Sequence, residues 1–277
     1  MLTDAHCHPF DLEKVFPGAE AERRRLGVLC AASATDLKEF EHNEELSRRA
    51  KAEAAPLLLP CFALHPQLPA AYTAEGKSGG SGTQANFKDA LATLETLAGQ
   101  GRLAAIGETG FDLYNAAFKE TEKIQDELFA VHLETALHYE LPLVLHVRRA
   151  MHKVFAHARV LKKCKSVIFH SWSGTLGEGE TLLKKGVNAF FSFGTTIMLN
   201  HHEAMRCCAV FHLTSILTET DAPYQPLCGS PCSSWGDLPR ILAAAAALRR
   251  QAGTKGASPE ELEVAIETNF KKAFGVY

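Results

Sequence analysis

The sequence predicts a single (β/α)8 barrel of the TIM type, in which eight parallel strands alternate with helices around one sheet. Three observations support this fold class. Eight short apolar runs are spread over the 277 residues, with helical patterns between them. The runs are continuous and do not alternate with polar residues, as expected for parallel strands that are covered on both faces. The turn after the first run contains His6, Cys7 and His8, whereas a doubly wound open sheet, the main alternative, predicts a glycine-rich turn there.

The predicted strands are separated by stretches long enough to hold a helix, which is the pattern of repeated strand–helix units. Their boundaries follow the apolar runs. They are Leu2–His6, Leu26–Ala31, Leu57–Ala63, Leu103–Gly107, Leu143–Val147, Val167–Phe169, Val187–Phe193 and Ser215–Thr218.

Between these runs, apolar residues recur at positions i, i+4 and i+7, the spacing of one face of a helix. Three stretches have this spacing, beginning at Phe87, Ile124 and Val154. We expect Asn86 to cap the first of these helices. The last helix is predicted to begin at Ser258, because Pro259 suits its first position and Glu261 completes a capping box.

Residues 1–277 are expected to form one domain, because we find no linker and no internal repeat. Residues 73–86 stand apart, since they are rich in glycine and serine and have no periodicity. Such a segment buries too little apolar surface to offset the entropy lost on ordering, so we predict a flexible insertion loop. The loop follows the third strand, so in a barrel it lies on the active-site face. It is either an insertion that the surface tolerates or a flap that covers the substrate.

The composition is that of an ordinary globular protein, with 46% hydrophobic and 22% charged residues. It excludes fibrous, disordered and disulfide-stapled proteins. The net charge of -3 provides no general attraction to nucleic acid, so a polyanion would need a local basic cluster. No apolar run reaches the ~18 residues needed to cross a bilayer, and the charged N-terminal segment does not resemble a signal peptide. We therefore expect a cytoplasmic protein with no membrane association and no obligate protein partner.

The eight cysteines are too sparse for a disulfide scaffold, so we expect free thiols. Cys30, Cys61 and Cys164 lie in or beside apolar stretches and are predicted to be buried. Cys228 and Cys232 form a C-x-x-x-C pattern, but no second pair of the C-x-x-C type completes a zinc site. A cysteine-based zinc site is therefore disfavoured.

Residues of metal-ligating types recur at the ends of the predicted strands. The set comprises His6, His8, His65, Glu108, His146, His170 and Asp221. Because the C-terminal ends of all strands in a parallel barrel meet at one rim, we expect these side chains to surround one cavity. A single histidine at a strand end is more often structural. Seven such residues from six strands predict a metal site.

The spacing of these residues suits two ions. His6 and His8 are two residues apart, so in a strand both imidazoles point to the same face and can bind one cation. Asp221 follows the last strand, which lies beside the first, and is placed to complete that shell. A second ion would be bound by His146 and His170. Glu108 would bridge the two ions. Two cations that share a carboxylate lower the pKa of a water molecule towards neutrality and so provide a nucleophile.

Six short motifs around these residues occur in a characteristic order. They are residues 4–8, 64–66, 106–112, 146–148, 170–174 and 219–223. Together they resemble the TatD family of metal-dependent deoxyribonucleases, and the resemblance covers nearly the whole chain. It implies a TIM-like barrel, a divalent-metal centre and 3′-to-5′ exonuclease action on DNA. It also implies the ligand set His6, His8, Glu108, His146, His170 and Asp221, with Glu108 and Asp221 assigned the catalytic role and His65 and Arg148 contacting the substrate phosphate.

The residues themselves support these two substrate contacts. Arg148 lies two residues beyond His146, so it shares a strand face with that ligand and its guanidinium can reach a phosphate oxygen; an ordinary salt bridge at the rim is the alternative. His65 can donate a hydrogen bond to a phosphate or to a leaving alkoxide, and capping of a turn is its alternative. Asp4 and Asp112 are expected to support the ligands without binding the metal.

The chain departs from the family pattern in two places. Family members usually carry an Arg-Asn-Glu-Pro stretch after the last ligand, where this chain has residues 234–239 and lacks the arginine. His132 stands where the family often has glutamine. Two alternatives to a DNA phosphodiesterase therefore remain: a hydrolase of a small amide, lactone or phosphoester at the same centre, and a non-catalytic binding module. The element also stays open, because imidazoles favour zinc or manganese, whereas the resemblance points to magnesium.

Overall fold

The computed structural model describes residues 1–74 and 82–276 and has the predicted (β/α)8 architecture. Eight strands run parallel in the order β1 to β8, and each pairs with the next. The strands are β1 Thr3–Cys7, β2 Leu29–Ala34, β3 Leu58–Phe62, β4 Ala105–Asp112, β5 Leu143–Arg148, β6 Val167–Phe169, β7 Ala189–Phe193 and β8 Ile216–Thr218. The hydroxyl of Thr218 donates a hydrogen bond to Thr3 O at 3.0 Å, which brings β8 against β1 in a nearly closed barrel.

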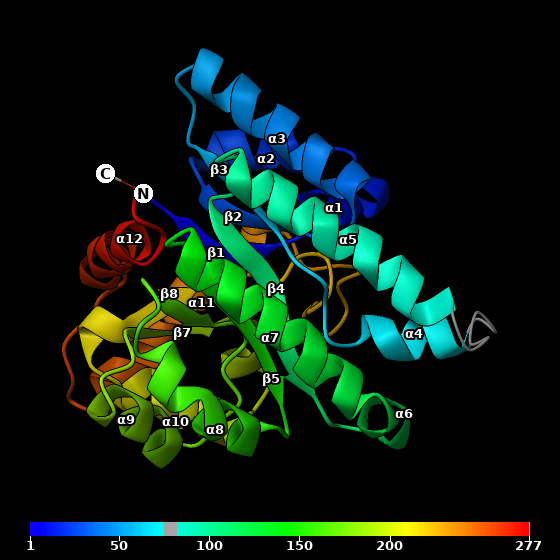
Figure 1. The fold of residues 1–277 in the computed structure, drawn as a ribbon. Coiled ribbons are helices and arrows are strands. Elements are labelled where there is room, and N and C mark those ends of the chain that lie inside the picture. The colour runs from blue at the N-terminus through cyan, green and yellow to red at the C-terminus, as the bar shows by residue number, and fades with distance from the viewer. Residues whose placement is uncertain (75–81, 277) are drawn as a thin grey trace.

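Helices surround this sheet (Figure 1). They are α1 Pro9–Val15, α2 Ala19–Leu26, α3 Leu37–Ala52, α4 Leu68–Ala74, α5 Gly82–Gly99, α6 Ala116–Glu120, α7 Glu122–His138, α8 Met151–Leu161, α9 Leu176–Lys184, α10 His202–Val210, α11 Leu238–Gln251 and α12 Pro259–Phe274, with 3-10 turns at Thr195–Met198, Leu213–Ser215 and Trp235–Asp237. Buried side chains between the helices and the outer face of the sheet form the larger part of the core.

The last helix, α12, closes the N-terminal end of the barrel (Figure 1). Phe270 and Phe274 pack with the residues that fill the barrel interior, such as Ile168 and Phe190. The Asn269 amide donates to Ile216 O, at the start of β8, at 2.9 Å. α12 begins as predicted, since the Ser258 side chain accepts a hydrogen bond from the Glu261 amide at 3.2 Å. This helix therefore covers the end of the barrel opposite the rim at which the strands end.

All eight predicted strands are present, and two of them, β2 and β4, differ from the predicted bounds by three residues or more at one or both ends. β2 begins at Leu29, because Leu26 ends α2 and Gly27 terminates that helix in a left-handed conformation with φ 69°. β4 continues to Asp112, so Glu108 lies within a strand and does not follow one. The extension carries Phe111, which is fully buried in the core.

The predicted loop of residues 73–86 is only partly described. Residues 75–81 lie outside the described residues, and the flanking residues end α4 and begin α5. The predicted cap at Asn86 is wrong, because α5 already begins at Gly82. Gln84 and Ala85 are good helix formers, which favours this earlier start.

Cys30, Cys61 and Cys164 are buried free thiols, as predicted. Within the described parts of the chain, no helix combines the length and apolar character that crossing a bilayer requires.

Candidate metal centre

The predicted ligands converge at the C-terminal rim of the barrel. They come from β1, β4 and β5 and from the residues just after β1, β6 and β8. His6, His8, Glu108, His170 and Asp221 are buried. His146 is the most accessible of the set, with 16% of its side chain exposed. The rim is therefore the single place where all six side chains meet.

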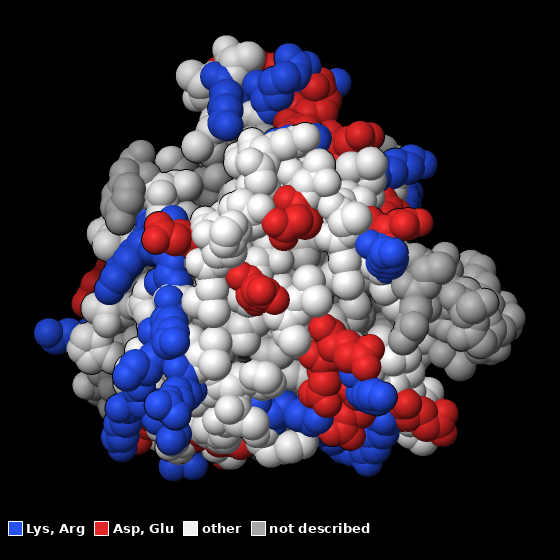
Figure 2. Space-filling model, in the orientation of Figure 1, with Lys and Arg blue, Asp and Glu red and all other residues white. Residues whose placement is uncertain are grey.

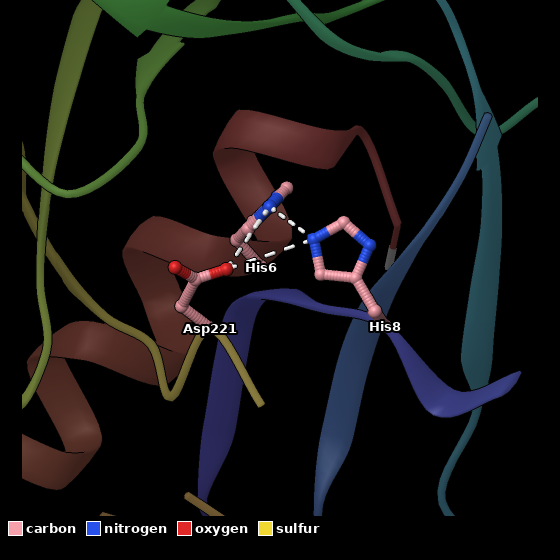
Figure 3. Close-up of side chains that lie close together, drawn as sticks. All are labelled: His6, His8 and Asp221. Atoms are coloured by element: carbon pink, nitrogen blue, oxygen red, sulfur yellow. Dashed lines mark hydrogen bonds and ion pairs between the residues drawn. The ribbon is translucent and has the colours of Figure 1, made fainter. Parts of the chain in front are cut away.

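His6, His8 and Asp221 form the first group (Figure 3). The Nε2 atoms of His6 and His8 lie 3.1 Å apart, and Oδ1 of Asp221 lies 3.6 Å from each of them. Two neutral imidazoles gain no energy by pointing their nitrogen lone pairs at each other, unless a proton or a cation lies between them. The donor atoms of this group therefore fit a cation.

Glu108 lies between two groups of imidazoles. Its Oε2 atom is 3.1 Å from Nε2 of His6. Its Oε1 atom is 2.8 Å from Nδ1 of His146 and 3.4 Å from Nε2 of His170. The two oxygens thus face different histidines, which is the arrangement that a bridging carboxylate needs.

His65 lies closer to these residues than its predicted role as a substrate contact requires. Its Nε2 atom is 3.0 Å from Oε1 of Glu108, and it forms a group with Glu108 and His146 whose donor atoms all lie within 4.8 Å of one another. Arg148, the other predicted substrate contact, is exposed at the rim. Its guanidinium carbon lies 3.6 Å from the ring centre of Tyr114. Both residues border the same cavity as the ligands.

Three polar side chains hold the outward nitrogens of the histidines. Ser33 Oγ lies 3.2 Å from Nδ1 of His6. Glu219 Oε1 lies 3.0 Å from Nδ1 of His170. Asp112 Oδ2 lies 3.1 Å from Nε2 of His146, in the supporting position predicted for it. With these partners, each ring directs its other nitrogen towards the centre, and such partners orient metal-binding histidines in general. Ser33 and Glu219 were not among the residues that the sequence pattern indicated.

Asp4 supports the site through the backbone. Its carboxylate accepts hydrogen bonds from the amide of His6 at 3.2 Å and from the amide and hydroxyl of Thr220 at 2.9 Å and 2.6 Å. The Asp221 amide donates to His6 O at 3.0 Å. These bonds tie the end of β1 to the segment after β8 and fix the distance between His6 and Asp221.

The charges of the centre balance one another. Burial alone would lower the pKa of His8 and His170, but hydrogen bonds and charges from Asp221, Glu108 and Glu219 outweigh it and raise each pKa to about 10. Burial would likewise raise the pKa of Glu108, yet the surrounding imidazoles hold it well below its usual value. The carboxylates are therefore compensated by positive charge on the imidazoles, and a divalent cation would supply that charge in their place.

The rim opens into a cavity of about 1510 Å³. Asp11 and Glu39, from α1 and α3, border it on one side. Arg148 and Arg149 border it at the end of β5, across the barrel from β1. Glu178 and Glu203 also line it, so the cavity is acidic at several places, and its two arginines lie together at the end of β5.

Comparison with known proteins identifies the family of the chain. The chain matches the TatD related DNase family over residues 3–275. It is 29% identical over 190 residues to an uncharacterized metal-dependent hydrolase TatD of Mycobacterium tuberculosis, which covers 68% of this chain and 70% of that protein. It is 29% identical over 191 residues to the 3'-5' ssDNA/RNA exonuclease TatD of Citrobacter rodentium, covering 66% and 69% of the two chains. The crystal structure of YjjV, a TatD homologue from Escherichia coli, has a TM-score of 0.79 at 24% identity and covers 100% of this chain and 98% of its own. The chain belongs to the TatD related DNase family of metal-dependent hydrolases.

Proposed function

We propose that the protein hydrolyses phosphodiester bonds of DNA, as a 3′-to-5′ exonuclease that uses two divalent cations. The observation that carries the proposal is the position of Glu108, whose two oxygens face different histidines. The name of the Citrobacter rodentium relative, a 3'-5' ssDNA/RNA exonuclease, supports the substrate class.

In this proposal His6, His8 and Asp221 would hold the first cation. His146 and His170 would hold the second, and Glu108 would be shared between the two. The imidazole nitrogens favour zinc or manganese over magnesium, which prefers oxygen ligands. When bound, such a pair supplies an activated water at neutral pH and neutralises charge on the phosphate oxygens.

The remaining chemistry belongs to the side chains. Gln225 Nε2 donates to Oδ2 of Asp221 at 2.8 Å, which leaves Oδ1 facing His6 and His8. Because Oδ1 faces the histidines that would hold the first cation, we assign Oδ2 of Asp221 as the acceptor of the proton that the attacking water would lose. Glu108 stays ionised because its pKa is held low, so it keeps its negative charge throughout.

Two residues would bind the substrate. Arg148 is exposed at the cavity rim and can bond a non-bridging phosphate oxygen through its guanidinium. His65 donates through Nε2 to the same phosphate or to the departing alkoxide in place of Glu108, because its Nδ1 accepts the Gln67 amide at 3.1 Å. Its ring lies beside His146, with 4.7 Å between the ring centroids, which keeps it at the edge of the centre.

The direct test incubates protein loaded with Mn²⁺, Zn²⁺ or Mg²⁺ with single-stranded DNA labelled at its 5′ end, beside a panel of amide, lactone and small phosphoester substrates. We expect shortening of the DNA from the 3′ end, and no product with Glu108→Ala protein. Turnover confined to the panel would replace DNA by a small substrate. If the metal-loaded protein turns over none of these substrates, the result would support a non-catalytic binding module.

A further inference from the structure

Tyr114 at the cavity rim carries two arginines on its ring. It lies just after β4, and the arginines lie at the end of β5. The guanidinium carbon of Arg148 is 3.6 Å from the ring centroid and that of Arg149 is 4.6 Å from it. All three residues border the cavity of the metal centre. On the face shown in Figure 2, Lys and Arg side chains gather mostly at the lower left, and Asp and Glu side chains lie mostly at the centre and lower right. The tyrosine thus holds two positive charges close together beside the site.

Neither arginine has a carboxylate partner among the described residues, whereas others do, for example Arg102 with Glu44 at 2.7 Å. Both arginine side chains are exposed. A guanidinium stacked on an aromatic face keeps its N–H groups free to bind an anion, and its planar fork matches phosphate oxygens. These two groups are therefore available to a ligand.

The backbone at Arg149 is also unusual. Its φ is 55°, in the left-handed region, which glycine adopts more readily than a residue with a side chain. The turn leads from β5 into α8, and it returns the Arg149 Nη1 group to within 3.5 Å of Tyr114 O. Strain of this kind at the edge of a cavity points to a functional constraint on the residue.

Arg148 and Arg149 follow closely along the chain from a residue of the metal centre. His146 contacts Glu108, Arg148 is two residues beyond it, and Arg149 follows. Asp11 and Glu39 on the other wall of the cavity would repel a phosphate, as would Glu178 and Glu203, which also line it. A strand with several phosphates is therefore drawn along the β4–β5 side of the rim.

We propose that Tyr114, Arg148 and Arg149 form a subsite for a second phosphate of a nucleic-acid strand, next to the phosphate that is cleaved. The inference rests on the proposed function and deepens it. Arg148 spans the two phosphates and Arg149 binds only the second. The subsite makes the protein selective for a polynucleotide over a diester with one phosphate.

The first test measures binding without cleavage. A fluorescent ten-residue oligothymidylate with phosphorothioate linkages is titrated with Mn²⁺-loaded protein, and its anisotropy gives the affinity. We expect Arg149→Ala to weaken binding about tenfold, the usual effect of removing a charge-assisted hydrogen bond. The plot of log affinity against log salt should become shallower by about 0.7, because the variant neutralises one phosphate fewer. Arg149→Lys should recover only part of the affinity, because an ammonium group cannot stack as a planar fork.

The matched control is Arg159→Ala, which removes the same charge from the far end of α8. Arg159 is exposed and does not border the cavity. If Arg149→Ala and Arg159→Ala bind the oligonucleotide alike, the subsite does not exist. Thermal unfolding of both variants verifies that they are folded.

The second test separates this inference from the proposed function. It compares kcat/KM for a single-stranded oligonucleotide with that for bis(p-nitrophenyl) phosphate, which has one phosphate. We expect Arg149→Ala to lower the oligonucleotide-to-diester ratio about tenfold. Equal losses on both substrates would overturn the subsite while the hydrolase remains. Absence of cleavage by the wild-type protein, with the binding difference preserved, would overturn the nuclease function and leave the subsite standing.

Discussion

Nδ1 of His170 lies 3.0 Å from Oε1 of Glu219, and both side chains are buried. The same Glu219 oxygen accepts the Ser171 amide at 2.8 Å. This contact turns Nε2 of His170 towards Glu108, 3.4 Å away. Glu219 therefore orients His170, a proposed metal ligand, through the ring nitrogen that faces away from Glu108.

Glu219→Gln should weaken metal binding by 10- to 100-fold, because a neutral amide orients and polarises the imidazole less well than a carboxylate. The dissociation constant for Zn²⁺ or Mn²⁺ is measured by competition with a chromophoric chelator. Glu180→Gln, on the exposed part of α9, is the matched control. An unchanged dissociation constant would mean that Glu219 accepts the Ser171 amide but does not orient His170 for metal binding.

Glu108→Ala should remove about one equivalent of metal per chain, because the bridge between the two proposed ions is gone. Metal content is measured by mass spectrometry after dialysis against buffer without chelator. Circular dichroism should show a folded protein, since β4 retains its pairing with β5 around that position. Two equivalents in the variant would rule out the bridging assignment.

Removing the metal should lower the melting temperature. A cation at 100 times its dissociation constant stabilises the folded state by about 2.7 kcal/mol, which corresponds to roughly 5–10 °C for a protein of this size. The apo-protein should remain folded, because the histidines and carboxylates of the centre pair with one another. Scanning calorimetry with and without EDTA measures the shift, and a shift of the same size in Glu108→Ala would assign the stabilisation to the ion proposed at His6, His8 and Asp221 alone.

Much of the fold was predictable because each parallel strand leaves a continuous apolar run in the sequence. The exception at β2 has a local cause, since Leu26 and Val28 extend the apolar run across the Gly27 cap of α2. The convergence of His6, Glu108 and His170 was predictable because strand ends meet at one rim.

The supporting residues were not predictable in the same way. Ser33 and Glu219 are single polar residues near strand ends, and their roles depend on which histidine they face across neighbouring strands. The two-residue spacing of Glu219 and Asp221 is the one available signal. The pairing of Tyr114 with Arg149 was also beyond sequence reasoning, because it depends on the left-handed turn at Arg149.

His132 should make stability depend on pH. Its Nε2 atom accepts the Leu64 amide at 2.9 Å, and Nδ1 donates to Leu128 O at 2.6 Å. Both bonds need a neutral ring, and burial lowers the pKa of His132 from 6.5 to about 4. The unfolded chain therefore takes up a proton at a higher pH than the folded protein. The resulting stabilisation is complete above pH 6.5 and is lost as the pH falls towards 4, by roughly 3 kcal/mol in total.

His132→Gln should lose this part of the pH dependence, because the amide can accept and donate the same two bonds but does not titrate in this range. Urea unfolding in EDTA at pH 7, 5.5 and 4.5 gives the free energy of unfolding without interference from metal release. The same substitution at exposed His138, also on α7, controls for the loss of an imidazole from this helix. If His132→Gln and the wild-type protein lose stability in parallel as the pH falls, the ring is protonated inside the folded protein. The bond to the Leu64 amide, next to His65, would then be absent at low pH.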